Sequence, residues 1–86
     1  MKGCHDNHSD VAPVIRWKFE RDHRHLMCAI HAIPAASSYE VATVPLWDVG
    51  QTAVETFNSP SAALQRHAAI AADLRSAGWT VAAYTV

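Results

Sequence analysis

The stretch from Phe57 to Trp79, FNSPSAALQRHAAIAADLRSAGW, constrains the fold most, because its own residues predict where one long helix begins and ends. Ser59 is a preferred N-cap residue, and Pro60 after it suits the first helical position. Gly78 suits the end of the helix, since glycine adopts the left-handed conformation without a clash of its own β-carbon. We therefore predict a helix over about residues 60–77.

This helix is amphipathic, so its apolar side must pack on another part of the chain. The apolar side is formed by residues that recur at helical spacing, namely Ala63, Leu64, His67, Ile70, Ala71, Leu74 and Ala77. Much of the opposite side is polar. Because it has one apolar stripe, the helix can cover only one face of a sheet.

Length and charge limit the classes of protein to which the chain can belong. With 86 residues it is close to the size at which one core is barely sufficient, so we expect a single domain over residues 14–86 after a flexible, polar tail of residues 1–13. The net charge of −1 gives no global attraction to nucleic acid or to a membrane. Two cysteines, Cys4 and Cys28, make no disulfide framework, and no apolar run is long enough to span a bilayer. We expect a cytoplasmic protein with reduced thiols and no contact with membranes.

Strand-like patterns lie before and after the helix. Residues 14–20 alternate between apolar and polar side chains, which predicts a half-buried strand. A short polar turn separates them from a second strand over residues 25–31, so the pair is expected to form an antiparallel hairpin. Residues 39–44 predict a third strand, and residues 52–57 either a fourth strand or the return arm of a bent hairpin. Residues 80–86 are rich in strand-forming side chains and predict a final strand.

Together these elements predict an α+β fold, an antiparallel meander of three to four strands with one long helix on one face and a short C-terminal strand. The other face of the sheet stays open. Its side chains are too apolar to meet only water and too polar to form a core, and they are Arg16, Lys18, Glu20, His25, Met27, Ala29, His31, Glu40, Ala42 and Val44. We expect this open face to bind a protein partner or a second copy of the chain.

We expect the open face to bind through residues of the first hairpin, and the candidates are Arg16, Lys18, Arg21, Arg24, His25, Met27 and His31. The basic members of this set suggest an alternative function, a regulator that binds nucleic acid through phosphate contacts. Trp17 and Phe19 alternate to the buried face, so no aromatic platform is expected beside the basic side chains. A solvated, charged hairpin is the simpler interpretation.

A cysteine and two histidines in the tail, Cys4, His5 and His8, suggest a metal site, because thiolate and imidazole suit zinc or copper. Their spacing does not form a paired-knuckle pattern, and the core offers no evident second pair. Weak metal binding by a solvated tail is the simpler interpretation. His25 and His31 cannot share an ion, because six residues of strand separate them by roughly 20 Å.

Catalysis has little support in the sequence. His67 lies within the apolar stripe of the helix, and no nucleophile with an orienting carboxylate can be assigned to it. His23 and His25, two residues apart, could hold an ion together, although surface histidines are the simpler interpretation. The chain has no glycine-rich phosphate loop, no CxxC and no nucleophile elbow. We therefore expect a protein that is not an enzyme and needs no cofactor.

Helix caps and core positions resemble those of a group of small, uncharacterised bacterial proteins. The resemblance rests on Tyr39-Glu40-Val41, on FNSPSAAL at residues 57–64 and on LRSAGW at residues 74–79. In those proteins, strands precede F-x-S-P/T-x-x-A-L, a helix, and L-x-x-x-G-W. The resemblance covers residues 14–82 and implies a bacterial, cytoplasmic protein of this fold, without implying an activity.

Two better-characterised groups share the outline of strands followed by a helix. Antitoxins of the HicB type combine three strands, a helix and a strand, but Val44-Pro45-Leu46 is a poor match to their acidic-Pro-Gly pattern. Arm-binding domains of integrases use three strands and a helix, and they are more basic than this chain. Neither similarity implies site residues, because a shared fold does not establish a shared function.

Overall fold

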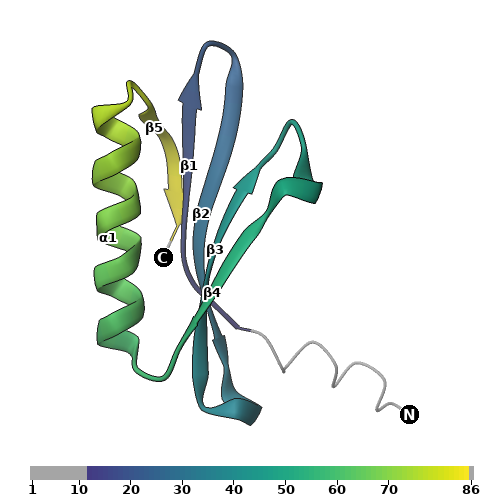
Figure 1. Ribbon diagram of the computed structural model, residues 1–86, viewed down its shortest axis with the longest axis vertical. Coiled ribbons are helices and arrows are strands. Elements are labelled where there is room, and N and C mark those ends of the chain that lie inside the picture. Colours follow the sequence, from purple (N-terminus) through teal and green to yellow (C-terminus); the bar gives the residue numbers. More distant parts are fainter. Residues whose placement is uncertain (1–11, 86) are drawn as a thin grey trace.

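Five strands form one antiparallel sheet, and a long helix lies along one face of it (Figure 1). The computed structural model describes residues 12–85. Its regular elements are β1 (Ala12–Arg21), β2 (Arg24–Ile33), β3 (Ser38–Pro45), β4 (Ala53–Phe57), α1 (Pro60–Ser76) and β5 (Thr80–Thr85). The strand order across the sheet is β4-β3-β2-β1-β5. The predicted α+β class, with a strand meander, one helix and a C-terminal strand, is confirmed.

The first four strands form the predicted meander. β1 and β2 are joined by a tight turn in which Asp22 and His23 have φ angles of 52° and 67°. Two positive φ angles are typical of a type I′ turn, whose twist matches that of the strands beside it. Short 3₁₀ turns at Pro34–Ala36 and Val49–Gln51 lie in the next two connections. β4 pairs with β3, so the alternative of a fourth strand is the correct one.

Both ends of α1 have the caps that the sequence predicts. The Ser59 hydroxyl accepts a hydrogen bond of 3.1 Å from the backbone N–H of Ala62. At the other end Gly78 has a φ of 96°. The Gly78 N–H donates to the Arg75 carbonyl at 3.0 Å, and the Trp79 N–H donates to the Leu74 carbonyl at 2.9 Å. This pair of bonds forms a Schellman motif, which turns the chain sharply into β5.

α1 carries the chain from one edge of the sheet to the other. β4 is one edge strand, and β5 pairs with β1 at the opposite edge (Figure 1). The pairing of β5 with β1 shifts register between Lys18 and Phe19, where β5 contains one extra residue. The helix lies along one face of the sheet and packs mainly on β2, β3 and β4.

The core lies between α1 and this covered face. Phe19 and Cys28 have no exposed surface, and Val41 is 1% exposed. Burial of a side chain the size of Phe19 contributes roughly 1.5–3 kcal/mol. The helix meets these residues with Ala63 and Ala71, whose small side chains let its backbone approach the sheet closely.

The apolar stripe of the helix is narrower than the sequence predicts. Buried positions of α1 are Ala63, His67 and Ala71, with Ile70 and Leu74 partly buried beside them. Leu64 is 49% exposed, so its expected place in the core is wrong. Ala77 is also exposed. Both lie at the margins of the stripe, where helical spacing alone does not distinguish a buried position from an exposed one.

Gly78 offers a direct test of the helix end. Gly78→Ala should lower the free energy of unfolding by roughly 1–2 kcal/mol, because a residue with a β-carbon resists the left-handed conformation. Gly50→Ala is the matched control: a β-carbon there would lie 3.4 Å from an Asp48 side-chain oxygen, and the backbone has no positive φ. Urea denaturation measures both variants. Equal stability of Gly78→Ala and the wild type would contradict the cap.

Candidate functional site

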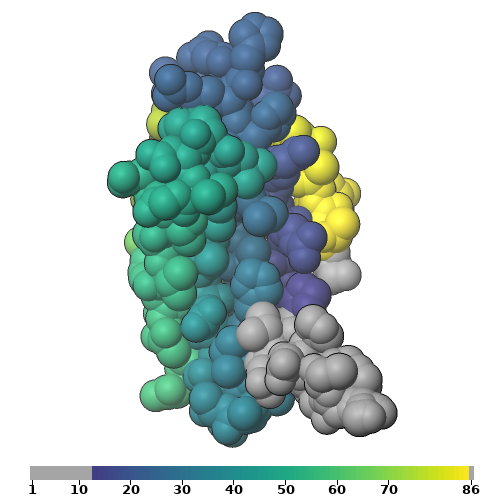
Figure 2. Space-filling view, turned by 90° about the vertical axis from the view of Figure 1, so that its right-hand side faces the viewer, coloured from purple at the N-terminus to yellow at the C-terminus, as the bar shows by residue number. Residues whose placement is uncertain are grey.

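The open face of the sheet is built from the outward positions of its inner strands. Neighbouring strands place these side chains in rows, since residues that pair across an antiparallel sheet point to the same face. In one row Met27 lies between Lys18 and Val44, and in the next Ala29 lies between Arg16 and Ala42. Figure 2 looks onto this face, on which β3, β2, β1 and β5 lie side by side.

Apolar side chains occupy the centre of this face. Ala29 has no exposed surface and Ala42 is 8% exposed, although both point away from α1. Met27 and Val44 beside them are partly exposed. On the edge strand, Val54 pairs with Ala42 and is 52% exposed. The apolar strip defined by these five residues crosses three strands of the sheet.

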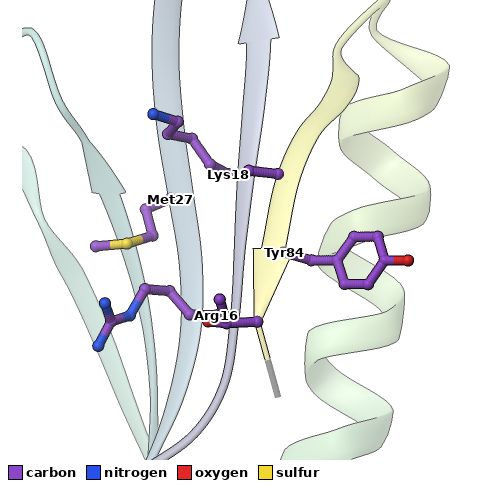
Figure 3. Close-up of a pocket in the computed structure, with 6 residues that line it drawn as sticks. Arg16, Lys18, Met27 and Tyr84 are labelled. Atoms are coloured by element: carbon purple, nitrogen blue, oxygen red, sulfur yellow. The ribbon is translucent and has the colours of Figure 1, made fainter.

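A shallow hollow lies beside the apolar strip, where β1 meets β5. It has a volume of about 270 Å³ and is lined by Arg16, Lys18, Met27, Ala83, Tyr84 and Thr85. Figure 3 shows Arg16, Lys18 and Met27 projecting from the same side of the sheet, whereas Tyr84 projects toward α1. The hollow combines two cationic groups with a thioether side chain, so it suits contact with an anionic group beside an apolar one.

The two histidines of the open face lie at opposite ends of β2. His25 pairs with Glu20, and its Nε2 atom is 3.8 Å from a carboxylate oxygen of Glu20. His31 pairs with Glu40. Each imidazole thus has a carboxylate beside it at the margin of the face. Within residues 12–85, no three His, Cys, Asp or Glu side chains are placed to hold a metal ion.

Arg21 and Arg24 do not lie on the open face, which corrects their grouping with Arg16 and Lys18. Arg24 lies over the ring of Trp47, with 5.2 Å between its guanidinium carbon and the ring centroid. Arg21 lies beside Gly78, at the end of α1. The physical reason is strand alternation: Arg21 follows Phe19 by two positions and Arg24 precedes Leu26 by two, so both share the face of the core.

An aromatic pair that the sequence pattern does not predict lies beside these two arginines. Trp47 and Trp79 are stacked, with ring centroids 5.9 Å apart and planes inclined by 14°. Trp47 follows β3, and Trp79 follows the Schellman motif of α1. No local pattern links two tryptophans so far apart in the chain. The contact depends on where the end of α1 lies relative to the end of β3.

The candidate metal ligands Cys4, His5 and His8 lie outside the described residues, and metal binding by them stays a prediction. In the described part of the chain, no helix is both long enough and apolar enough to cross a membrane.

His67 and Cys28 meet in the core beneath α1. The Nε2 atom of His67 lies 3.2 Å from the Cys28 carbonyl oxygen, and since a carbonyl only accepts, His67 donates this bond. Trp17 packs edge-on against the imidazole, with ring centroids 5.3 Å apart. Burial lowers the pKa of His67, whereas its bond to the carbonyl raises it to a smaller extent. Burial also raises the pKa of the Cys28 thiol to about 11.

This pair is poorly suited to nucleophilic chemistry. The thiolate is the reactive form of cysteine, and a pKa of about 11 keeps Cys28 protonated near neutral pH. Cys28 has no exposed surface and His67 is 4% exposed, so neither can meet a substrate without an opening of the core. Both residues contribute to packing, with His67 joining the helix to the central strand.

The lowered pKa of His67 predicts a loss of stability in weak acid. The unfolded chain takes up a proton below the ordinary histidine pKa of 6.5, whereas the folded protein resists protonation. The free energy of unfolding should therefore be highest above pH 6.5 and fall as the pH decreases through the lower pKa of the folded state. Denaturant titrations between about pH 5 and pH 8 measure this dependence.

Two variants assign the effect to this side chain. His67→Gln keeps a donor for the Cys28 carbonyl and should reduce the pH dependence. His23→Asn is the matched control. Asparagine tolerates the positive φ of this exposed turn, so the variant should fold normally and keep the pH dependence of the wild type. A wild-type stability that does not change over this range would contradict the burial of a neutral His67.

Comparison with known proteins does not assign the chain to a family. No family model matches it, and no curated protein and no solved structure matches it either.

Proposed function

We propose that the protein is an interaction module that binds a second copy of itself through the open face of its sheet. One observation carries the proposal: the apolar strip lies at the centre of a face that the protein's own helix does not cover. Antiparallel sheets that meet water on one side carry polar side chains there. Here the central outward positions of β2 and β3 are Met27, Ala29, Ala42 and Val44.

The distribution of charge on the face supports an interface. Charged and titratable side chains surround the apolar strip: Arg16 and Lys18 on β1, Glu20 and His25 at one end, and His31 and Glu40 at the other. An apolar centre with a polar rim is the usual anatomy of a protein–protein interface. Water can reach the rim while the strip is covered.

The size of the face is adequate for a dimer. Five strands spaced by about 4.8 Å and five to ten residues long present a surface on the order of 500 Å² in projection. The accessible area of a surface with projecting side chains is larger than its projection. A standard interface buries about 800 Å² on each partner, so most of this face would take part.

A two-fold axis brings the two apolar strips together. If the axis runs along the strands between β2 and β3, Met27 and Ala29 of one copy face Val44 and Ala42 of the other. Two sheets packed in this way keep their strands within about 30° of each other, and their inner side chains interdigitate. The same contact is then made twice, as a symmetric dimer requires.

A cytoplasmic location is part of the proposal. Cys28 is a free, buried thiol in the central strand. Such a residue is compatible with a reducing compartment, where free thiols persist.

Val44→Glu tests the proposed interface. Light scattering at protein concentrations of about 10 µM to 1 mM should give twice the chain mass of 9.4 kDa for the wild type. Val44→Glu should give the mass of one chain, because an unpaired carboxylate in a dry interface has a large desolvation cost. Circular dichroism checks that the variant is folded.

Leu64→Glu is the matched control. Leu64 is 49% exposed and lies on α1, on the opposite side of the sheet from the open face. This variant should stay dimeric. A wild type that remains monomeric at 1 mM, or a dimer that Val44→Glu leaves intact, would refute a second copy as the occupant of this face.

A further inference from the structure

We propose that the tip of the β1–β2 hairpin binds single-stranded nucleic acid, with Trp47 and Trp79 as a platform for bases and Arg21 and Arg24 as contacts for phosphates. Its two arginines lie on the side of the sheet that α1 covers, whereas Lys18 and His25, which also border the site, belong to the rim of the open face. The proposal rests on the groups at the hairpin tip and not on dimer formation.

The aromatic platform is preformed. Trp47 and Trp79 stack nearly parallel, with ring centroids 5.9 Å apart, and Trp47 is 46% exposed. Trp79 is held in place because it packs against the core and follows the Schellman motif directly. The exposed part of the Trp47 indole is planar and apolar, so it gains contact area from a base that packs against it.

Two guanidinium groups lie beside the platform. Arg24 lies 5.2 Å from the centroid of the Trp47 ring. Arg21 lines the same hollow as Trp79. The Arg21 Nε atom would lie 3.6 Å from a β-carbon on Gly78, the residue before Trp79. Arg21 contacts Asp22 at 3.5 Å, but these side chains are 49% and 85% exposed. Such an exposed ion pair is weak, so a phosphate can replace the carboxylate at little cost.

Two hollows adjoin these groups. One has a volume of about 420 Å³ and is lined by Arg21, Asp22, Arg24 and Trp79. The other has a volume of about 260 Å³ and is lined by Lys18, His23, Arg24, His25, Leu46 and Trp47. Arg24 borders both hollows, so together they form a path around the hairpin tip.

The charge of this path is opposite to that of the whole chain. Three cationic side chains and one carboxylate line the two hollows, whereas the chain has a net charge of −1. The positive charge is therefore local. Local positive charge beside aromatic rings is the combination by which proteins bind unpaired strands, where phosphates and base faces alternate.

An unpaired strand fits these groups better than a duplex does. Bases in a duplex are stacked on one another, so their faces cannot reach a tryptophan. A protein that reads a duplex usually inserts a helix or a strand pair into a groove. The helix of this protein lies on the sheet, and the two indoles, which follow β3 and α1, lie beside the hairpin tip.

Fluorescence anisotropy with labelled strands of about ten thymidines or ten uridines tests the proposal, and a duplex of the same length serves as the comparison. Binding should weaken as salt increases. Each phosphate contact contributes a slope of about −0.7 in a plot of log affinity against log salt, so Lys18, Arg21 and Arg24 together predict a slope of about −2. Stacking should also quench the tryptophan fluorescence.

The double variant Arg21→Gln/Arg24→Gln should reduce the slope to about −0.7 and weaken binding at least tenfold at low salt. Arg75→Gln is the control, because this exposed residue of α1 lies over Trp17 and lines neither hollow. It should bind as the wild type does. Trp47→Leu, in which the core-packed Trp79 is kept, should weaken binding without unfolding the protein.

Binding of either strand with these effects supports the proposal, and a preference for thymidines or uridines tells DNA from RNA. No binding at low salt would overturn the proposal. Equal binding by the double arginine variant and the wild type would also overturn it, as would tighter binding to the duplex.

Discussion

The contact between α1 and the sheet, centred on Ala63, His67 and Ala71, is the constraint on which the rest of the structure depends. Two methyl side chains let the helix lie close to Phe19, Cys28 and Val41, and the bond from His67 to the Cys28 carbonyl joins it to the central strand. A chain of this size forms one core, and that core uses one face of the sheet. The path of the helix also places β5 at the far edge, so the sheet has five strands.

Two surfaces follow from this arrangement. The open face has an apolar strip that the helix cannot reach, and we propose that a second copy covers it. The hairpin tip extends past the end of α1, where Trp79 stacks on Trp47 beside Arg21 and Arg24. One surface suits an apolar partner and the other an anionic, planar one. A dimer formed through the open faces would leave Arg21, Arg24 and the two tryptophans free, and the two surfaces would share only Lys18 and His25.

Elements with local signals could be predicted from the sequence. Ser59, Pro60 and Gly78 fix the ends of the helix through hydrogen bonds and backbone angles that depend on nearby residues. Alternation in β1 and β2 predicts which side chains meet the core. The same alternation places Arg21 and Arg24 on the face of the core. Grouping them by charge with Arg16, on the open face, was wrong. The stack of Trp47 on Trp79 depends on the packing of distant segments, which no local pattern contains.

The most direct test of the central claim, that a second copy covers the open face, is the solvent accessibility of the methyl groups of Met27 and Val44. A soluble paramagnetic agent broadens the NMR signals of methyl groups that it can approach. Met27 and Val44 should be protected at about 1 mM protein and become accessible on dilution, whereas Leu64 on α1 should be accessible at both concentrations. Equal accessibility of Met27 and Val44 at both concentrations would contradict the claim.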